Sequence, residues 1–317
     1  MAQRIVYLSW PAREISGGIK MAFRHVEVLR ESGFDAVVAT TDAGPPAWFQ
    51  TTAPVIDLNA MTNGEDVLVF PENHHGLLQA FRPWPNRKVV FCQNWFTAIR
   101  GLGECCSFSD FGVSGLLCVD PYTARYCHLR FPLLPAGIVP VSIDREQFYA
   151  EGQKKVQIAY MPRKRPREAA FIRDLFQAAH PEFCSIPWIE LHGATESQVA
   201  ATLRESAVYL SLCRLESCPL TILEALACGC LTAGFTGLGG RQYTTTRNGF
   251  WAEEDDCISC ADRLAEAVRL VAEGGARCGD MLEAIHITAR QYSRERMARG
   301  VVDFWQACLA MGAPTAR

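Results

Sequence analysis

The chain has 317 residues, enough for two domains that each bury a hydrophobic core. Hydrophobic residues make up 49% and charged residues 21% of it, as in an ordinary soluble enzyme. The formal net charge of −3 gives no overall attraction to nucleic acid or to an acidic membrane surface. No apolar run approaches the length of a membrane span, and residues 1–4 lead into an expected strand instead of a signal peptide. We therefore expect a cytoplasmic protein.

The first half of the chain alternates short apolar segments with helical ones, which is typical of a doubly wound α/β domain. Residues 4–9 read as a buried strand, followed by a loop with Gly17 and Gly18, a helix that ends near Gly33 and a second strand over 35–40. Further strands are expected over 67–70, 88–92 and 115–119, and a helix from Asp120 to about residue 129. The Gly17-Gly18 loop matches neither the dinucleotide fingerprint nor the phosphate loop, and a simple tight turn is an alternative.

Polar side chains follow two of these strands, at the edge where open α/β sheets bind ligands. Glu72, His74 and His75 follow one strand, and Gln93 and Asn94 follow the next. A histidine pair at a strand end is also common as a surface feature. If the chemistry needs a general base, Glu72, His74 or His75 is the nearest candidate.

The second half opens with a strand over 156–160, a basic run and a helix over about 167–179. Arginine and lysine bind a diphosphate through forked and point-charge contacts, and Arg163 and Lys164 are our candidates for that role. A solvated run or a nucleic-acid patch are the alternatives. Because no second basic patch or aromatic platform accompanies the run, we expect no nucleic-acid partner.

The segment over 208–235 combines a buried strand, a loop, a short helix and another strand. Pro219 suits the first helical position, and the helix start that follows the strand is a ready site for phosphate. Glu216 precedes this helix and Glu224 lies inside it, so both carboxylates could bind hydroxyls of one sugar or ribose. The alternative is that they are solvated charges at a helix start. Another strand over 188–192 ends in His192-Gly193, and a long helix with an apolar side covers about 294–311.

The fourteen cysteines do not have the pattern of a disulfide framework. Several lie in apolar segments, where a free thiol behaves as a small hydrophobic group. Cys257 and Cys260 form the only C-x-x-C pair, with no second pair at zinc spacing, so a pair at a helix start is the simpler interpretation. We expect no metal and no other cofactor.

Residues 214–230, Arg-Leu-Glu-Ser-Cys-Pro-Leu-Thr-Ile-Leu-Glu-Ala-Leu-Ala-Cys-Gly-Cys, resemble the signature of retaining GT-B glycosyltransferases of the group 1 type, family GT4. Residues 138–148 are similar to the segment that joins the two domains in that family. The resemblance implies two Rossmann-like domains, 1–148 on the acceptor side and 149–293 for the nucleotide sugar, facing a central cleft. It also implies a last helix, over 294–312, that packs back on the first domain.

The resemblance also implies roles for the candidate residues. Glu216 would face the donor sugar, and Glu224 would hold the nucleotide ribose. Arg163, Lys164 and the backbone of Pro219, Leu220 and Thr221 would hold the diphosphate. The backbone of Gly17 and Gly18 would approach the same diphosphate. His192 and Gly193 would line the pocket for the nucleotide base. Gln93 stands where relatives often have a histidine, and would bind a sugar by hydrogen bonds. Glu72, His74, His75 and Asn94 remain weaker acceptor-side candidates.

The implied activity is transfer of a sugar from a nucleoside diphosphate sugar to an acceptor hydroxyl with retention, in cell-envelope polysaccharide or glycoconjugate synthesis. The acceptor would be a saccharide or a lipid-linked saccharide. A lipid-linked acceptor would put the enzyme at the inner face of the membrane, although no amphipathic anchor is evident in the sequence. Three alternatives stay open: a nucleotide-sugar epimerase, a non-catalytic GT-B binding subunit, and an NAD(P) oxidoreductase, which would lack its glycine fingerprint.

Overall fold

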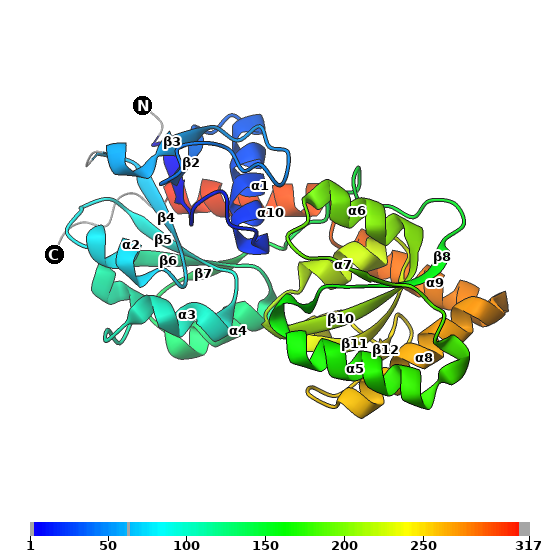
Figure 1. The fold of residues 1–317 in the computed structure, drawn as a ribbon. Helices are drawn as coiled ribbons and strands as arrows, with labels where there is room; N and C mark the ends of the chain where they lie inside the picture. The colour runs from blue at the N-terminus through cyan, green and yellow to red at the C-terminus, as the bar shows by residue number, and fades with distance from the viewer. Residues whose placement is uncertain (1–2, 62–63, 311–317) are drawn as a thin grey trace. The chain divides into compact units, whose positions relative to one another are not determined.

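The computed structural model describes residues 3–61 and 64–310, which form two compact units. The first unit contains the described residues up to Val141 and from Glu295 onward, and the second is Ser142–Arg294. The sequence had placed the two boundaries at 148/149 and 293/294. Each unit is a parallel sheet with helices on both faces (Figure 1), so the α/β class expected from the sequence is confirmed.

The first unit has a seven-stranded sheet in the order β3-β2-β1-β4-β5-β6-β7. Its strands are β1 (Ile5–Leu8), β2 (Ala36–Thr40), β3 (Val55–Asp57), β4 (Val67–Pro71), β5 (Lys88–Cys92), β6 (Val113–Cys118) and β7 (Ala136–Ile138). Its helices are α1 (Gly17–Glu31), α2 (His75–Ala80), α3 (Trp95–Leu102), α4 (Pro121–Arg130) and α10 (Arg294–Ala310), with 3₁₀ turns η1 (Leu58–Ala60) and η2 (Phe108–Phe111). Residues 311–312 of the expected last helix lie outside the described residues.

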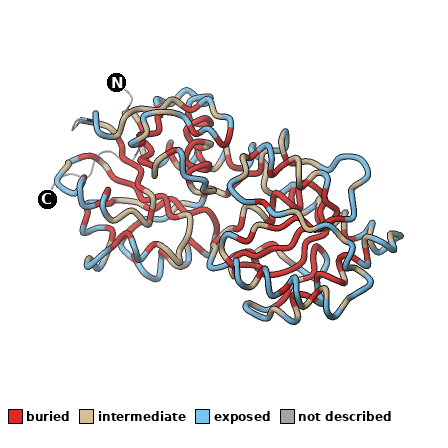
Figure 2. The backbone as a smooth tube through the Cα atoms, in the orientation of Figure 1, coloured by how far each residue is buried: buried red, intermediate tan, exposed pale blue. Residues whose placement is uncertain are grey.

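The strand order reverses at β1, which pairs with β2 on one side and β4 on the other. This is the switch point at which doubly wound sheets bind ligands, beyond the carboxyl ends of the strands. All of β1 is buried, as the red centre of the unit shows in Figure 2. A strand that is buried on both faces has a continuous run of apolar residues, and for this reason β1 could be predicted from the sequence.

Helix α10 is built into the core of the first unit by its aromatic side chains. Trp305 is fully buried, and its indole Nε1 donates to the hydroxyl of Tyr7 at 3.1 Å. The same hydroxyl lies 3.2 Å from Nδ1 of His25, whose pKa burial lowers to about 3. Phe304 packs against Gly137 so closely that a Cβ there would overlap its ring.

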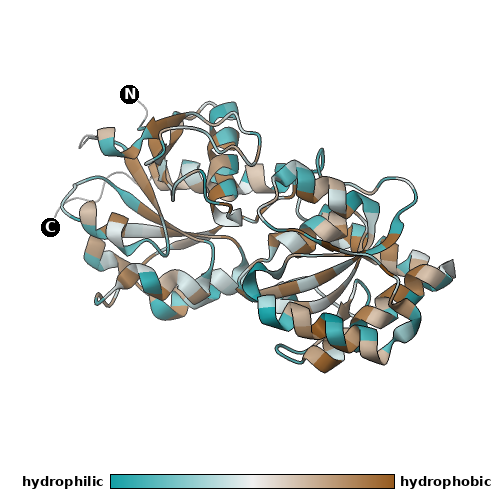
Figure 3. Ribbon diagram, in the orientation of Figure 1, coloured by the Kyte–Doolittle hydropathy of each residue, from teal (hydrophilic) through white to brown (hydrophobic). Residues whose placement is uncertain are grey.

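The second unit has a five-stranded sheet in the order β12-β11-β10-β8-β9. Its strands are β8 (Lys155–Tyr160), β9 (Trp188–Glu190), β10 (Ser206–Glu216), β11 (Leu231–Leu238) and β12 (Phe250–Trp251). Its helices are α5 (Pro166–Ala179), α6 (Glu196–Glu205), α7 (Leu220–Ala227), α8 (Cys257–Glu273) and α9 (Gly275–Arg290), with 3₁₀ turns η3 (Pro162–Lys164), η4 (Pro181–Phe183) and η5 (Gly239–Gln242). In Figure 3 the strands are largely brown or white, whereas the helices alternate between brown and teal.

Several expectations about local structure were wrong. The strand expected over 188–192 ends at Glu190, and Pro219 is the residue before α7 instead of its first helical residue. Gly17 and Gly18 are the first residues of α1 and not a loop before it. The short helices α2 and α3 begin at His75 and at Trp95, in segments where the sequence indicated loops. Helices of six or eight residues are held by tertiary packing, so their periodicity carries little signal.

Candidate functional site

The carboxyl edge of the second sheet brings together two of the predicted site residues. Lys164 follows β8 and Glu216 ends β10, and these strands are parallel neighbours. The Lys164 ammonium forms an ion pair with Oε1 of Glu216. Both side chains are partly exposed, at 30% and 23%, so the pair is open to a ligand from solvent.

The backbone around Glu216 has an unusual conformation that two neighbouring strands impose together. Leu215 and Leu238 have φ values of 49° and 71°, which cost side-chain-bearing residues free energy. The register between β10 and β11 shifts between Cys213 and Glu216, so that Glu216 pairs with Leu238. Gly239 follows, where a Cβ would overlap the carbonyl oxygens of Glu216 and Ser217. The Glu216 carboxylate therefore depends on a close backbone contact that only glycine permits.

The basic run after β8 divides into residues with different environments. Arg163 is exposed and forms no ion pair with a described residue, while Lys164 reaches Glu216. Arg165 is only 1% exposed: its Nε donates to the Cys213 carbonyl at 3.1 Å, and its guanidinium lies 4.3 Å from the Phe235 ring centroid. That guanidinium also pairs with three carboxylates, Glu254 at 2.6 Å, Glu168 at 3.6 Å and Asp255. Arg165 therefore joins three segments of the edge.

Helix α7 begins beside the ion pair and contains the second carboxylate of the motif. Pro219 precedes its first residue, Leu220, and no side chain caps this helix start. The Pro219 carbonyl accepts a hydrogen bond from the Tyr243 hydroxyl at 2.8 Å, which fixes the entry to the helix. Thr221 Oγ1 lies 3.6 Å from the Cys213 sulfur. Glu224 is buried, at 5% exposure, within the second turn.

His192 and Gly193 follow β9 on the other side of β8. Both are exposed, and Gly193 has a φ of 60°, which favours glycine. Thr195 and Gln198 then form a reciprocal capping box that begins α6. His192 is therefore held in a short, defined loop at the same sheet edge as Lys164.

In the first unit, the structure joins Gln93 to one of the two predicted glycines. The Gln93 amide donates from Nε2 to the carbonyl of Gly18 at 3.0 Å. A Cβ at Gly18 would lie 3.2 Å from that nitrogen, so glycine lets the amide reach the backbone. Gly17 begins α1 after Ser16, whose side chain does not cap the helix.

Glu72 is a buried carboxylate that binds the start of α3. It accepts hydrogen bonds from the backbone N–H groups of Gln93 at 3.3 Å and Asn94 at 3.1 Å, and from the Thr97 hydroxyl at 3.0 Å. Burial raises the pKa of Glu72 to about 7, against these hydrogen bonds, which favour the charged form. Asn94 caps α3 by accepting from the N–H of Phe96.

The two adjacent histidines face different elements. The His74 ring accepts from the N–H of Leu77 at the start of α2 and stacks on Trp10 with 3.9 Å between ring centroids. Partial burial lowers the pKa of His74. Nδ1 of His75 lies 3.1 Å from the carbonyl of Gly101 in α3. The structure therefore does not bring the pair together as one acid–base unit.

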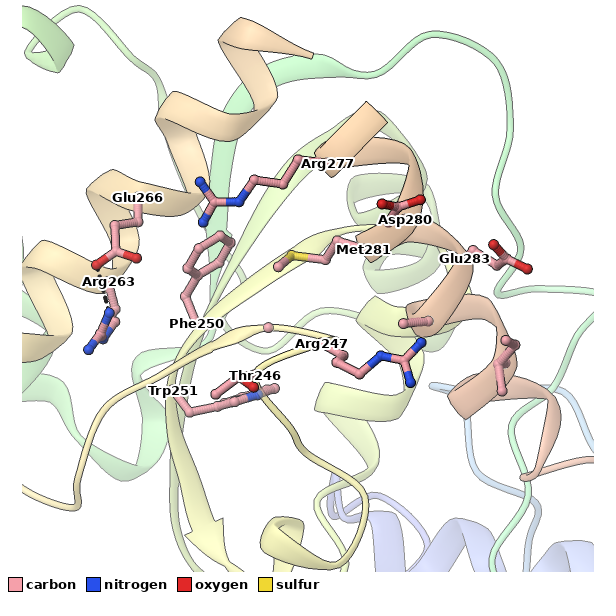
Figure 4. A pocket seen from close by; sticks show the side chains of 13 residues that line it. Thr246, Arg247, Phe250, Trp251, Arg263, Glu266, Arg277, Asp280, Met281 and Glu283 are labelled. Carbon is pink, nitrogen blue, oxygen red and sulfur yellow. Dashed lines mark hydrogen bonds and ion pairs between the residues drawn. The ribbon is translucent and has the colours of Figure 1, made fainter. Parts of the chain in front are cut away.

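A cavity of about 590 Å³ in the second unit lies away from these residues, and none of the predicted site residues lines it. Phe250, Trp251 and Met281 contribute apolar surface, and Arg247 from the loop before β12 and Arg277 from α9 contribute charge (Figure 4). Across residues 3–61 and 64–310, no group of three or more metal-ligating side chains is placed to hold a metal ion. No described helix is long and apolar enough to cross a bilayer.

Sequence reasoning missed three residues that shape these edges. Arg165 lay in the basic run, but its burial depends on Glu254 and Asp255, about ninety residues away. Gly239 lies between Gly237 and Gly240 in the sequence, yet the atoms that require a glycine there belong to the end of β10 and the residue after it. Trp10 follows β1, and its indole donates to Asn73 at 3.1 Å beside His74. For Trp10, its position just after a strand was the one local feature that could have indicated a place at the ligand-binding edge of the sheet.

No family model matches the chain. It is 25% identical over 279 residues to an alpha-1,6-glucosyltransferase of Actinobacillus pleuropneumoniae serotype 7, covering 83% of each chain. Among solved structures it is similar to HepE of Anabaena in complex with UDP, with a TM-score of 0.70, 11% identity and coverage of 96% and 100%. It is also similar to sucrose-phosphate synthase of Thermosynechococcus elongatus, with a TM-score of 0.69, 11% identity and coverage of 98% and 100%.

The structural neighbours share the arrangement of two parallel sheets covered by helices, while the sequence relative spans most of the chain. These findings agree with the motif over 214–230, whose first glutamate ends β10, whose second lies in α7 and whose glycine lies between α7 and β11. The resemblance inferred from the sequence is thereby confirmed: the chain is similar in sequence to a glucosyltransferase and similar in fold to GT-B glycosyltransferases.

Proposed function

We propose that the protein transfers a sugar from a nucleoside diphosphate sugar to a hydroxyl of a saccharide acceptor, with retention at the anomeric carbon. The observation that carries this proposal is the ion pair between Lys164 and Glu216, beside a helix that contains the buried Glu224. A cation, a partly exposed carboxylate and an uncapped helix start are the groups that a sugar diphosphate needs. They lie at the carboxyl edge of one parallel sheet, where such ligands bind.

Each group has a proposed part in the reaction. Lys164, assisted by Arg163 and the backbone of Pro219, Leu220 and Thr221, stabilises the charge that develops on the leaving diphosphate. Glu216 orients the donor sugar through its hydroxyls, and Glu224 accepts hydrogen bonds from the ribose. The acceptor hydroxyl attacks from the side of the departing diphosphate, whose oxygen takes its proton. The C–O bond to the diphosphate breaks as the new glycosidic bond forms.

Binding of the donor requires a rearrangement of the ion pair. Without ligand, Lys164 and Glu216 neutralise each other. A diphosphate competes with the carboxylate for the ammonium, since charge-assisted bonds to either anion are strong. The carboxylate released from Lys164 is then available to the sugar hydroxyls. We further propose that His192 and Gly193 line the base pocket, and that Gln93 and Asn94 contact the acceptor.

UDP-glucose is the donor to test first. HepE is described in complex with UDP and with UDP-glucose, and the sequence relative is named as a glucosyltransferase. We also propose a saccharide acceptor in cell-envelope polysaccharide synthesis, and a cytoplasmic protein at the inner face of the membrane. We expect the reaction to need no metal, because Lys164, Arg163 and the α7 amides supply the positive charge.

The experiment is calorimetric titration with UDP, GDP, ADP, dTDP and CMP, followed by transfer from the matching sugar nucleotide to an acceptor library. For Glu224→Ala we expect nucleoside diphosphate binding to weaken by about 1–3 kcal/mol, because the ribose hydroxyls lose their acceptor. For Glu216→Gln we expect turnover to fall far more than binding. Glu205→Gln, an exposed change at the end of α6, is the matched control.

Several results would contradict the proposal. Absence of binding to any of the five nucleotides would favour a non-catalytic subunit. Conversion of the sugar nucleotide without an acceptor would indicate an epimerase. A product with the inverted anomeric configuration, read from its proton coupling constants, would refute retention while leaving glycosyl transfer standing.

A further inference from the structure

Two neighbouring helices of the first unit expose large apolar side chains to solvent. On α3, Ile99 is 61% exposed, and on α4 Tyr122 and Leu129 are 54% and 72% exposed. Single exposed apolar side chains are ordinary, but several grouped on one surface mark an interaction site. Figure 3 shows apolar and polar colours alternating along both helices.

The two helices present these side chains on one continuous surface. Helix α3 connects β5 to β6 and α4 connects β6 to β7, all parallel strands, so both helices run in the same direction. The rings of Trp95 and Tyr122 lie 6.1 Å apart, which places the helix starts side by side. Ile99 therefore lies one turn and Leu129 two turns beyond that contact.

The charge on these helices differs from that of the chain as a whole. Residues 95–102 and 121–130 contain three arginines, Arg100, Arg125 and Arg130, and no aspartate or glutamate, although the chain carries a net charge of −3. All three arginines are exposed. Together with Ile99, Tyr122 and Leu129, they form a surface that we call the α3–α4 face.

We propose that the α3–α4 face binds the surface of an anionic membrane. Aromatic and aliphatic side chains flanked by arginines suit the boundary between lipid headgroups and acyl chains. The absence of carboxylates on these helices matches a negatively charged surface in particular. Neither helix is an anchor by itself, since α3 has eight residues and α4 has ten, so the sequence alone gave no sign of one. This inference does not depend on the proposed sugar transfer.

The test is co-sedimentation of the full chain with vesicles of phosphatidylcholine, with or without phosphatidylglycerol. We expect binding only to the anionic vesicles, weakened as salt is raised. Changing Arg100, Arg125 and Arg130 together to glutamine is expected to weaken binding about 100-fold, at roughly fivefold for each charge near the surface. The double variant Ile99→Asp, Leu129→Asp is expected to weaken it at least about tenfold, because it removes the inserting side chains.

Matched controls come from the second unit. Ile258→Asp changes an isoleucine of α8 that is 65% exposed, and changing the exposed Arg247, Arg277 and Arg290 to glutamine removes the same number of charges. Both controls should bind vesicles as the unchanged protein does, and thermal unfolding verifies that every variant is folded. Equal binding to neutral and anionic vesicles, or equal losses in face and control variants, would overturn the proposal. So would a face variant that alters only the oligomeric state, which would indicate contact between copies.

Discussion

Replacing Gly239 by alanine tests whether the close backbone contact under Glu216 determines the geometry of the site. Gly239 begins η5, directly after β11. A Cβ there would overlap the carbonyl oxygens of both Glu216 and Ser217. These are backbone atoms, which cannot rotate away as a side chain can, so the segment that carries Glu216 has to move.

The expected cost follows from this geometry. Inserting a methyl group into a tightly packed site costs about 1–3 kcal/mol, and we expect about 3 kcal/mol because both overlapping atoms belong to backbone. In a unit of this size, such a loss lowers the melting temperature by roughly 6–12 °C. A displacement of the Glu216 carboxylate by about 1 Å would also reduce turnover on the order of 100-fold.

The neighbouring glycine supplies the matched control. A Cβ at Gly240 would meet Ile222, Tyr243 and Pro219 at 3.5–3.6 Å, which is ordinary van der Waals contact. Gly240→Ala should therefore change stability by no more than about 0.5 kcal/mol. Denaturant unfolding of the two variants measures the difference without any assumption about activity. Equal stability of Gly239→Ala and Gly240→Ala would refute the reasoning.

Two further predictions concern buried charges. The pKa of Glu72 is raised from its ordinary 4.5 to about 7, and one pKa unit corresponds to about 1.4 kcal/mol. The contribution of Glu72 to stability is thus fully present below pH 4.5, and roughly 3 kcal/mol is lost as pH rises through about 7. Glu72→Gln should flatten this part of the stability–pH profile, and a profile parallel to that of the unchanged protein would contradict it. Arg165→Met should cost about 3 kcal/mol in denaturant unfolding, because Glu254 and Asp255 lose their buried partner, whereas Arg163→Met should cost less than about 0.5 kcal/mol. Similar losses for both arginine variants would show that burial of Arg165 does not matter.

The sheets could be predicted from the sequence because buried parallel strands are continuous apolar runs. The strand expected over residues 88–92 has the same first and last residues as β5, because every residue of β5 is buried. The short edge strands β3 and β7 were missed: they have three residues each and none of these residues is buried, so they lack that signal. Strand β10 continues past its buried segment, because its pairing with β11 resumes at Glu216 after a register shift that no local pattern indicates.

The candidate site could be predicted only where its residues share one local segment. Glu216 and Glu224 were located from a dense motif, and Lys164 from its place after a strand. The sequence could not distinguish Arg165 from its neighbours, because its environment is set by Phe235 and Glu254 in distant segments. Likewise, the contact between Gln93 and Gly18 joins residues 75 positions apart.

The buried chain of hydrogen bonds from Trp305 through Tyr7 to His25 has a consequence for synthesis on the ribosome. Trp305 and Tyr7 are 298 positions apart, so the first unit cannot complete its core until α10 has been translated. The second unit, Ser142–Arg294, is made in full before α10 emerges. We therefore expect the second unit to fold first. Strands β1 to β7 of the first unit are translated earlier but lack α10, so their core is incomplete until then. We expect these strands to be the part of the chain that binds chaperones or aggregates most readily.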